Sequence, residues 1–290
     1  MTKLWLAVGA VVLSIRPTVP LSAQSEAEQG KVVYEKWCAQ CHGDSGEGDG
    51  PAARYMYPRP RNFVTALYQV RSTASGLLPT DADIMNAIDN GLPGTTMPGW
   101  SDKLSSGDRR ALLAYIKTFS SFFADSSQLP QALEFGSAPG GGAEAIRLGK
   151  QFYDSIGCHK CHGPLGRGDG QSAPTLKDDD GMPMFAADLT QGWRFNGGFT
   201  VEDIYRRLRT GIDGTPMPSF SDLLDQKFVT DQELWHVAQY VASLSRGEPE
   251  MRDVIRAARV EGGALPGGPA DSTWAAVDTY YFPLVAQIIR

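Results

Sequence analysis

The chain has 290 residues, of which 42% are hydrophobic, and a formal net charge of -6 from 27 basic and 33 acidic side chains. This length suits two domains of about a hundred residues each, with further segments at the ends. The acidic balance argues against binding to nucleic acid or to anionic membranes, and it would favour a partner protein that carries a basic patch.

The first 23 residues have the features of a secretory signal peptide. Lys3 supplies the positive charge, residues 4–15 form an apolar run, and Ser22 and Ala23 precede a cleavage site at Gln24. This apolar run is too short to span a bilayer as a helix. We therefore expect export to the periplasm, removal of the signal and a mature protein that does not span the membrane. A signal that is retained as an anchor is the alternative.

After the signal, the sequence contains a cysteine motif, and its pattern predicts one helix before the motif and two helices after it. Residues 26–37 have the apolar spacing of an amphipathic helix, and they lead into the CxxCH motif at residues 38–42. A glycine-rich loop and an irregular region follow, and then a helix at residues 81–90 that Thr80 or Asp81 can cap. Met97 lies on the loop after that helix, and an amphipathic helix is expected at residues 106–119.

The same order of elements appears a second time after a linker rich in proline and glycine. Residues 145–156 predict a helix, residues 158–162 form the second CxxCH motif, and a helix is expected to end at Thr210. Met217 follows on a loop, and the last amphipathic helix spans residues 230–244. The two motifs are 120 positions apart, from Cys38 to Cys158, and together they use all four cysteines. The pattern indicates a duplicated domain.

The CxxCH motif has the spacing that covalent attachment of a c-type haem requires. Two thiols can add to the vinyl groups of one porphyrin, and the adjacent histidine then lies under the iron as its proximal ligand. A CxxC pair can also be a redox dithiol or half of a zinc site. Zinc would need a fourth ligand in each half, and no further cysteine exists. We predict two covalently bound haem c groups, with zinc or disulfide chemistry as the alternative.

Each motif is followed by a methionine at the same distance. Met97 and Met217 both lie 55 residues after the histidine of their motif, and a proline follows each of them. A thioether is a soft ligand for haem iron, and His/Met ligation raises the reduction potential. The alternative is that each methionine only fills an apolar core. We expect Met97 to pair with His42 and Met217 to pair with His162.

Glycines inside the first helix of each copy predict a close helix crossing. Gly30 and Gly149 occupy the same place in the two copies, and a glycine within a helix needs a packing reason. We expect Tyr115 of the closing helix to pack near Gly30, and Tyr240 to pack near Gly149. His236 has no partner motif and is expected to be a surface or packing residue.

Together these features resemble a dihaem cytochrome c that is built from two tandem class I type domains. The resemblance implies a mostly α-helical fold in which the N- and C-terminal helices of each domain cross. It implies the following division: a signal peptide at 1–23, domain 1 at 24–125, a linker at 126–143, domain 2 at 144–246 and a tail of unknown role at 247–290. It also implies that Cys38, Cys41, Cys158 and Cys161 hold the two haems and that His42, Met97, His162 and Met217 ligate the iron.

The resemblance also implies contacts around each haem. A proline carbonyl usually accepts the N–H of the ligand histidine in this family, and Pro174 fits that role in the second copy. The first copy departs from the pattern, so its carbonyl stays unassigned. Candidate neighbours of the haem propionates, which are equally compatible with solvated arginines and core tryptophans, are Arg59, Arg61, Trp100, Trp193 and Arg194.

The apolar end of the chain carries a second, weaker resemblance. From Asp271 through Trp274 it is similar to the opening of the haem-b-binding domain of ethylbenzene dehydrogenase and related molybdenum enzymes. This hints at service to a molybdenum oxidoreductase complex. A tail that docks on a partner or on the second domain is the simpler interpretation.

The function that these predictions favour is periplasmic transfer of single electrons, by a carrier that is not itself an enzyme. The two haems would relay electrons between a dehydrogenase or other donor and an acceptor such as a terminal oxidase, because six-coordinate irons leave no site for a substrate. One alternative is an electron-transfer subunit of a molybdenum oxidoreductase complex. Another is a dihaem peroxidase, which needs one iron with an open site, and the matched methionines argue against it.

Overall fold

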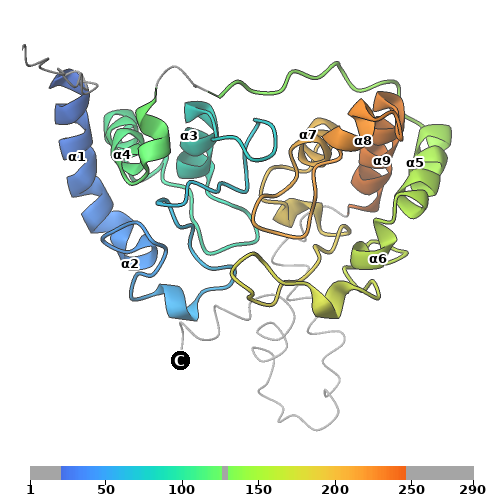
Figure 1. The fold of residues 1–290 in the computed structure, drawn as a ribbon, viewed down its shortest axis with the longest axis horizontal. Helices are drawn as coiled ribbons and strands as arrows, with labels where there is room; N and C mark the ends of the chain where they lie inside the picture. Colours follow the sequence, from blue (N-terminus) through green and yellow to red (C-terminus); the bar gives the residue numbers. More distant parts are fainter. Residues whose placement is uncertain (1–20, 126–129, 246–290) are drawn as a thin grey trace, which may run out of the picture.

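The computed structural model describes residues 21–125 and 130–245, which form two helical lobes lying side by side (Figure 1). The only β pairings within these residues are two isolated bridges, so the expectation of a mostly α-helical fold is confirmed. None of the helices in the described ranges has both the length and the apolar character needed to cross a bilayer. Most of the predicted signal peptide, part of the linker and the tail at 247–290 lie outside the described residues.

The first lobe is built on a crossing of its first and last helices. Its helices are α1 (Leu21–Trp37), α2 (Ala39–His42), η1 (Ala53–Tyr55), α3 (Asp81–Asn90), α4 (Ser106–Thr118) and η2 (Ser121–Ala124). Helices α1 and α4 cross at Gly30, where a Cβ atom would lie 1.9 Å from the carbonyl oxygen of Ala111 and 2.8 Å from the Cβ of Tyr115. The predicted packing of Tyr115 near Gly30 is therefore confirmed.

The second lobe repeats this crossing. Its helices are α5 (Ala143–Ser155), α6 (His159–His162), η4 (Ala173–Thr175), η5 (Gly192–Arg194), α7 (Val201–Thr210), α8 (Ser221–Asp225) and α9 (Asp231–Leu244). A Cβ on Gly149 of α5 would lie 2.0 Å from the carbonyl oxygen of His236 and 2.7 Å from the Cβ of Tyr240, both on α9. Tyr240 lies where it was expected, and His236 is buried in this packing. The sequence pattern did not predict the short helix α8.

Side-chain caps explain where four of the longer helices begin. In each case a hydroxyl group accepts the backbone N–H three residues later, and the acidic residue there accepts the N–H of the cap residue in return. These capping boxes are formed by Thr80, Ser105, Thr200 and Thr230. Helices α3 and α7 both end at a glycine in the left-handed region, Gly91 at φ 69° and Gly211 at φ 65°. Each methionine loop therefore begins after a helix that ends in the same way, at a glycine with positive φ.

Buried tyrosines connect the first helix of each lobe to the loop after its CxxCH motif. The hydroxyl of Tyr34 donates to the carbonyl of Gly43 at 2.7 Å, and that of Tyr153 donates to the carbonyl of Gly163 at 2.6 Å. Both side chains are fully buried in the hydrophobic core of their lobe. Each hydrogen bond fixes the glycine-rich loop against the core.

The described part of the linker runs along both lobes as an extended segment (Figure 1). Leu133 donates its N–H to the carbonyl of Ser72 in the first lobe at 2.8 Å. Further on, Phe135 packs edge-on against Tyr205 of the second lobe, with ring centroids 5.3 Å apart. The composition predicts a flexible linker, but apolar side chains and backbone hydrogen bonds hold this part of it in place.

We expect Gly149→Ala to lower the free energy of unfolding by about 2 kcal/mol or more, because the added methyl overlaps the α9 backbone and forces the two helices apart. Chemical denaturation of the haem-loaded protein measures this. Gly107→Ala in α4 is the matched control, since its Cβ would meet nothing closer than the Ser105 hydroxyl at 3.6 Å. The control should leave stability unchanged or raise it by up to about 1 kcal/mol. Equal stability of the two variants would contradict the close crossing.

Candidate functional site

Each cysteine pair lies on a single helical turn directly after the first helix of its lobe. In the first motif the N–H groups of Cys41 and His42 donate to the carbonyl of Cys38 at 3.1 and 2.9 Å, and the second motif repeats these bonds. None of the four cysteines forms a disulfide. Burial raises the pKa of the Cys38 and Cys158 thiols to about 12. Redox dithiols depend on a lowered thiol pKa, so these thiols argue against that alternative.

A backbone carbonyl orients the histidine of each motif. The Nδ1 atom of His42 lies 3.0 Å from the carbonyl oxygen of Arg61, and the Nδ1 of His162 lies 2.9 Å from that of Ala187. A carbonyl can only accept, so Nδ1 carries the proton in both rings and Nε2 keeps its lone pair. Burial also lowers the pKa of both histidines, which favours the neutral imidazole that a metal requires.

The prediction that the Pro174 carbonyl serves His162 is wrong. Pro174 lies in the exposed turn η4, and the carbonyl of Ala187 takes the role instead. The accepting carbonyl follows its histidine by 19 residues in the first lobe and by 25 residues in the second. The second lobe therefore has six extra residues before this point, which the constant spacing of the motifs hides.

The six extra residues of the second lobe lie in a hairpin, here called the acidic hairpin (residues 176–184). Its ends pair through a bridge between Lys177 and Pro183, and Met184 donates its N–H to the carbonyl of Leu176 at 2.9 Å. The tip carries Asp178, Asp179 and Asp180. The constant spacing returns at the caps Thr80 and Thr200, so the first lobe has its own extra residues between Phe63 and Thr80.

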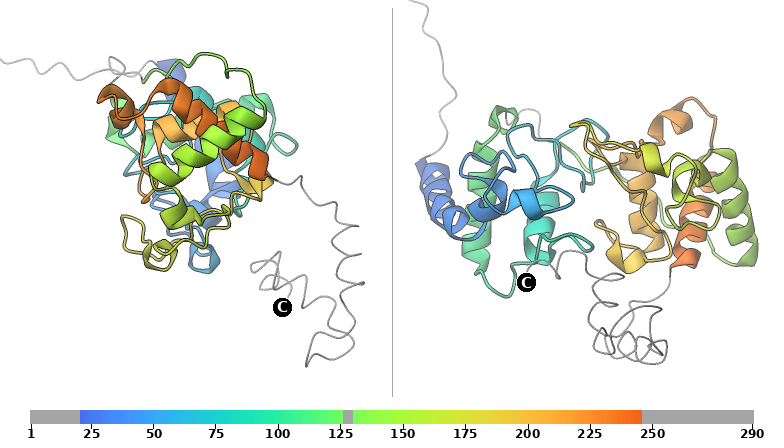
Figure 2. Two further views of the ribbon diagram at one scale, coloured as in Figure 1. Left: turned by 90° about the vertical axis from the view of Figure 1, so that its right-hand side faces the viewer. Right: turned by 90° about the horizontal axis from the view of Figure 1, so that it is seen from below.

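The extra segment of the first lobe carries Arg71, whose side chain is fully buried against the second lobe. Its guanidinium lies 2.8 Å from an Asp213 carboxylate oxygen and donates to the carbonyl of Thr210 at 3.0 Å. Asp213 also accepts from the Ser75 hydroxyl and the Gly76 N–H, both at 2.9 Å. This ion pair joins the two lobes, whose loops face each other in Figure 2.

The acidic hairpin contacts the first lobe in return. The hydroxyl of Tyr57 donates to the carbonyl of Pro183, and its ring packs edge-on against Phe185 with centroids 5.7 Å apart. Burial lowers the pKa of Arg61, and the nearby carboxylates of Asp180 and Asp178 oppose this shift. Each lobe thus uses the residues that the other lacks to contact its neighbour.

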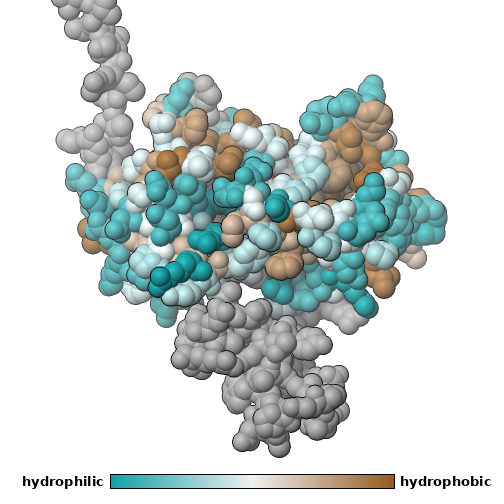
Figure 3. All heavy atoms as spheres, turned by 60° about the horizontal axis from the view of Figure 1, so that its bottom comes forward, coloured by the Kyte–Doolittle hydropathy of each residue, from teal (hydrophilic) through white to brown (hydrophobic). Residues whose placement is uncertain are grey.

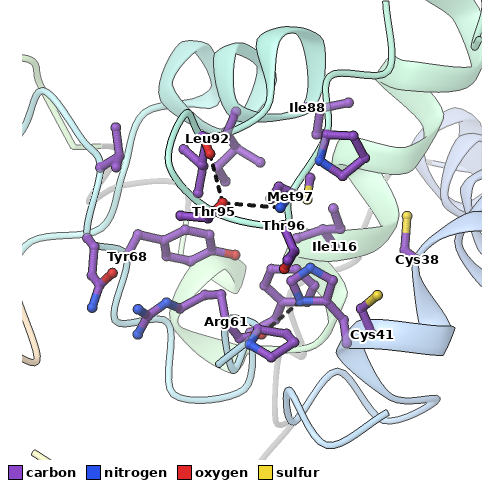
Figure 4. A pocket seen from close by; sticks show the side chains of 18 of the residues that line it. Cys38, Cys41, Arg61, Tyr68, Ile88, Leu92, Thr95, Thr96, Met97 and Ile116 are labelled. Atoms are coloured by element: carbon purple, nitrogen blue, oxygen red, sulfur yellow. Dashed lines mark hydrogen bonds between the residues drawn. The ribbon is translucent and has the colours of Figure 1, made fainter. Parts of the chain in front are cut away.

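The first candidate site is a cavity of about 150 Å³ between α2, α3 and α4. Figure 4 shows Cys38, Cys41, Arg61, Tyr68 and Met97 around it. His42 lines the same cavity and stacks on Phe63, with ring centroids 4.5 Å apart. The remaining wall is mostly apolar and includes Ile84, Ile88, Leu112 and Ile116. The structure therefore brings together every residue that the sequence assigned to the first haem.

Each methionine is held by the same set of hydrogen bonds. The N–H of Met97 donates to the hydroxyl of Thr95 at 3.1 Å, and this hydroxyl donates to the carbonyl of Leu92 at 2.7 Å (Figure 4). Thr215 forms the same two bonds to Met217 and Ile212, at 3.2 and 2.7 Å. The sequence motifs assigned no role to these threonines. They fix the backbone on which each thioether is presented.

Two buried donors in the first cavity have no hydrogen-bond partner among the described residues. These are the hydroxyl of Tyr68 and the indole N–H of Trp100. An unsatisfied buried donor costs about 1–3 kcal/mol, so such groups usually have a ligand or water as partner. The carboxylate arms of a haem would satisfy them. Together with two thiols, a histidine and a thioether, this set of donors fits a covalently bound haem.

The second candidate site is a larger cavity of about 980 Å³ that extends between the lobes. Cys158, Cys161, His162 and Met217 all line it. Its wall overlaps that of the first cavity, because residues 58–61, Gln69, Thr95 and Asn196 line both. The two sites are therefore adjacent, and these residues form a wall that they share.

The five candidate propionate neighbours are divided between the cavities. Arg59 and Arg61 line both, Trp100 lines the first and Arg194 lines the second. Trp193 is in neither lining. Sequence reasoning missed Tyr68, which lies in an irregular region where no periodic pattern marks a buried side chain.

The helical lobes, their CxxCH turns and their facing methionines define a c-type cytochrome with two haem sites. Residues 25–116 match the family model described as cytochrome c oxidase, cbb3-type, subunit III, and residues 146–245 match the model described as cytochrome c. The chain belongs to the dihaem cytochromes c with two tandem cytochrome c domains, and it carries two covalently bound haem c groups.

Individual relatives support the same assignment. The chain is 42% identical, with a TM-score of 0.70, to a chain of the reducing HAO-like protein complex of Kuenenia stuttgartiensis, covering 76% of this chain and 96% of that one. It is 24% identical over 232 residues to the cbb3-type cytochrome c oxidase subunit CcoP of Helicobacter pylori (strain 52), covering 77% of this chain. Over 90 residues, 31% of this chain, it is 31% identical to the CcoP subunit of Azospirillum brasilense. The matches span 60% and 27% of the lengths of the two CcoP subunits.

We expect Arg71→Met to lower the free energy of unfolding by about 3 kcal/mol, because it leaves the Asp213 carboxylate without its buried partner. Scanning calorimetry of the haem-loaded protein measures the loss. The same exchange at Arg147, which pairs with Glu144 on an exposed face of α5, is the matched control and should change stability little. The role of Arg71 would be refuted by two variants that melt alike.

Proposed function

We propose that the protein relays single electrons between a donor and an acceptor protein through its two haems. The cysteines Cys38 and Cys41 attach the first haem, and Cys158 and Cys161 attach the second. His42 with Met97, and His162 with Met217, are the axial ligands. The observation that carries this proposal is the overlap of the two cavities, each of which contains one histidine and one methionine.

The residues of this chain position the haems and shield them. When bound, each haem supplies an iron that changes between the ferrous and ferric states. The carbonyls of Arg61 and Ala187 hold the histidine rings in one tautomer and orientation, and Thr95 and Thr215 hold the methionine loops. Fixed ligands reduce the rearrangement that accompanies a change of iron charge. The shared wall gives electrons a short route from one haem to the other.

We further propose that this relay takes place in the periplasm, with the predicted signal at 1–23 as the basis. Relatives of the chain include a subunit of a cbb3-type oxidase and a chain of an HAO-like complex, which supports membership of a larger assembly. A molybdenum oxidoreductase complex stays an alternative. The segment from Asp271 that suggested it, and the tail at 247–290 that could dock on a partner, lie outside the described residues.

A dihaem peroxidase is the alternative in which the protein would be an enzyme. Peroxide needs an iron with an open or easily opened position. In this structure the backbone of both methionines is held by the same hydrogen bonds, and both side chains line their cavities. This equivalence favours the electron carrier.

We expect the oxidised protein to show the charge-transfer band of methionine-ligated iron at the red end of its spectrum, with an intensity that corresponds to two haems. Both irons should be low-spin when reduced, because six strong ligands are in place. Optical and magnetic spectra of the protein isolated with both haems measure this. High-spin iron in the reduced protein, or rapid turnover of peroxide, would favour the peroxidase and contradict our proposal.

We expect Met97→Ala to lower the midpoint potential of one haem and to leave the other nearly unchanged, because loss of the thioether removes a ligand that favours ferrous iron. A spectroscopic redox titration resolves the two midpoints. Met85→Ala is the matched control, since Met85 lies on α3 of the same lobe and lines neither cavity. If the potentials of Met97→Ala and wild-type protein coincided, the ligand assignment would fail.

A further inference from the structure

We propose that the second haem has the lower reduction potential, so that electrons enter the protein at the second lobe and leave from the first. This inference rests on the proposed electron relay and gives it a direction. Two independent differences between the cavities carry it, their charged groups and their exposure to solvent.

The charged side chains around the two cavities differ in kind. The first cavity has Arg59 and Arg61 in its wall and one carboxylate, Asp83. That carboxylate accepts hydrogen bonds from the Thr80 N–H at 2.8 Å and the Ser72 hydroxyl at 3.0 Å. The second cavity shares both arginines and adds Arg194, but its wall also contains six carboxylates: Glu47, Asp49, Asp178, Asp179, Asp180 and Asp188.

The acidic hairpin is the main source of this difference. It contributes three of the six carboxylates, and it contains the six extra residues that the first lobe lacks at this point. Asp179 is anchored at the cavity through its N–H, which donates to the carbonyl of Gly214 at 3.2 Å. Asp179 and Asp180 are exposed. The face of the molecule that Figure 3 turns toward the viewer is largely hydrophilic.

A ferric haem carries one more positive charge than a ferrous haem. Nearby carboxylates therefore stabilise the ferric state and lower the potential, whereas nearby arginines raise it. Because Arg59 and Arg61 line both cavities, they act on both haems. The carboxylates of the acidic hairpin line the second cavity alone, so their effect falls mainly on the second haem.

Burial acts in the same direction. Cys38 and His42 are buried, whereas their counterparts Cys158 and His162 are partly exposed; Cys41 and Cys161 are both partly exposed. Phe63 covers the His42 ring, and the position that forms the equivalent backbone bond in the second lobe is the smaller Leu189. The second cavity is also the larger and opens between the lobes. A dry site disfavours the extra charge of ferric iron and raises the potential, and this effect is stronger at the first haem.

The two effects together place the first haem above the second. A donor that reduces the haem of the second lobe then passes its electron downhill to the first lobe. The acceptor takes the electron from there.

The test neutralises the hairpin with Asp178→Asn, Asp179→Asn and Asp180→Asn in the full protein with both haems. Asparagine keeps the oxygen at position 178 that accepts the Met182 N–H at 2.8 Å, so the hairpin should fold. A redox titration followed by optical spectroscopy should show the lower midpoint rising while the upper midpoint stays in place. The gap between the midpoints in wild-type protein should also narrow at high salt, which screens exposed carboxylates.

The matched control removes the same charge from the same lobe at a distance from the cavity. Glu202→Gln, Asp222→Asn and Asp225→Asn alter three exposed carboxylates that line neither cavity. This variant should leave both midpoints close to the wild-type values. An equal shift in the control would mean that only the total charge matters, and it would overturn the proposal.

The Met97→Ala variant assigns the midpoints independently, because it should displace the upper one. The proposed order is overturned if Met97→Ala displaces the lower midpoint. It is also overturned if the hairpin variant raises the upper midpoint, or if it leaves both midpoints unchanged. These results leave the relay itself intact. The relay fails separately, through high-spin iron or peroxide turnover in the wild-type protein.

Discussion

The buried ion pair between Arg71 and Asp213 is the interaction on which the arrangement of this molecule depends. It joins the loops of the two lobes, and in this arrangement residues 58–61 line both cavities. The ion pair and the hydrogen bonds around it oppose separation of the lobes, and loss of either partner would leave the other charge buried without compensation. The contact between the lobes therefore places the two haem sites next to each other, with a wall of residues in common.

The two lobes are alike where they hold the haem and unlike where they contact each other. The CxxCH turn, the buried tyrosine, the capped helix and the methionine loop recur with the same hydrogen bonds. The differences that serve the contact between the lobes are the acidic hairpin and the segment that carries Arg71. After duplication, haem attachment constrained the first group of elements, and the contact between lobes could develop from the second.

Much of the fold follows from local sequence patterns, and the structure confirms these parts. Helical spacing, with the cap at Thr80, located the long helices, and the paired glycines predicted the two crossings. The prediction that the Pro174 carbonyl accepts from His162 was wrong because each lobe has an insertion. The two insertions have equal length, so the spacing between the motifs stays constant and conceals them. The lobe interface, the acidic hairpin and the inward-facing Tyr68 were not predictable, since they depend on contacts between residues far apart in the sequence. The short helix α8 escaped because five residues show no clear period.

The carbonyls of Arg61 and Ala187 that orient the two histidines belong to the main chain. No substitution of the side chain at either position removes the acceptor, so the histidine geometry is insulated from mutation there. The side chain at position 61 is then free to evolve as a charge between the two sites. One residue can thus hold a ligand in place with its backbone while its side chain responds to selection on redox properties, and sequence variation at this position would say nothing about the first role.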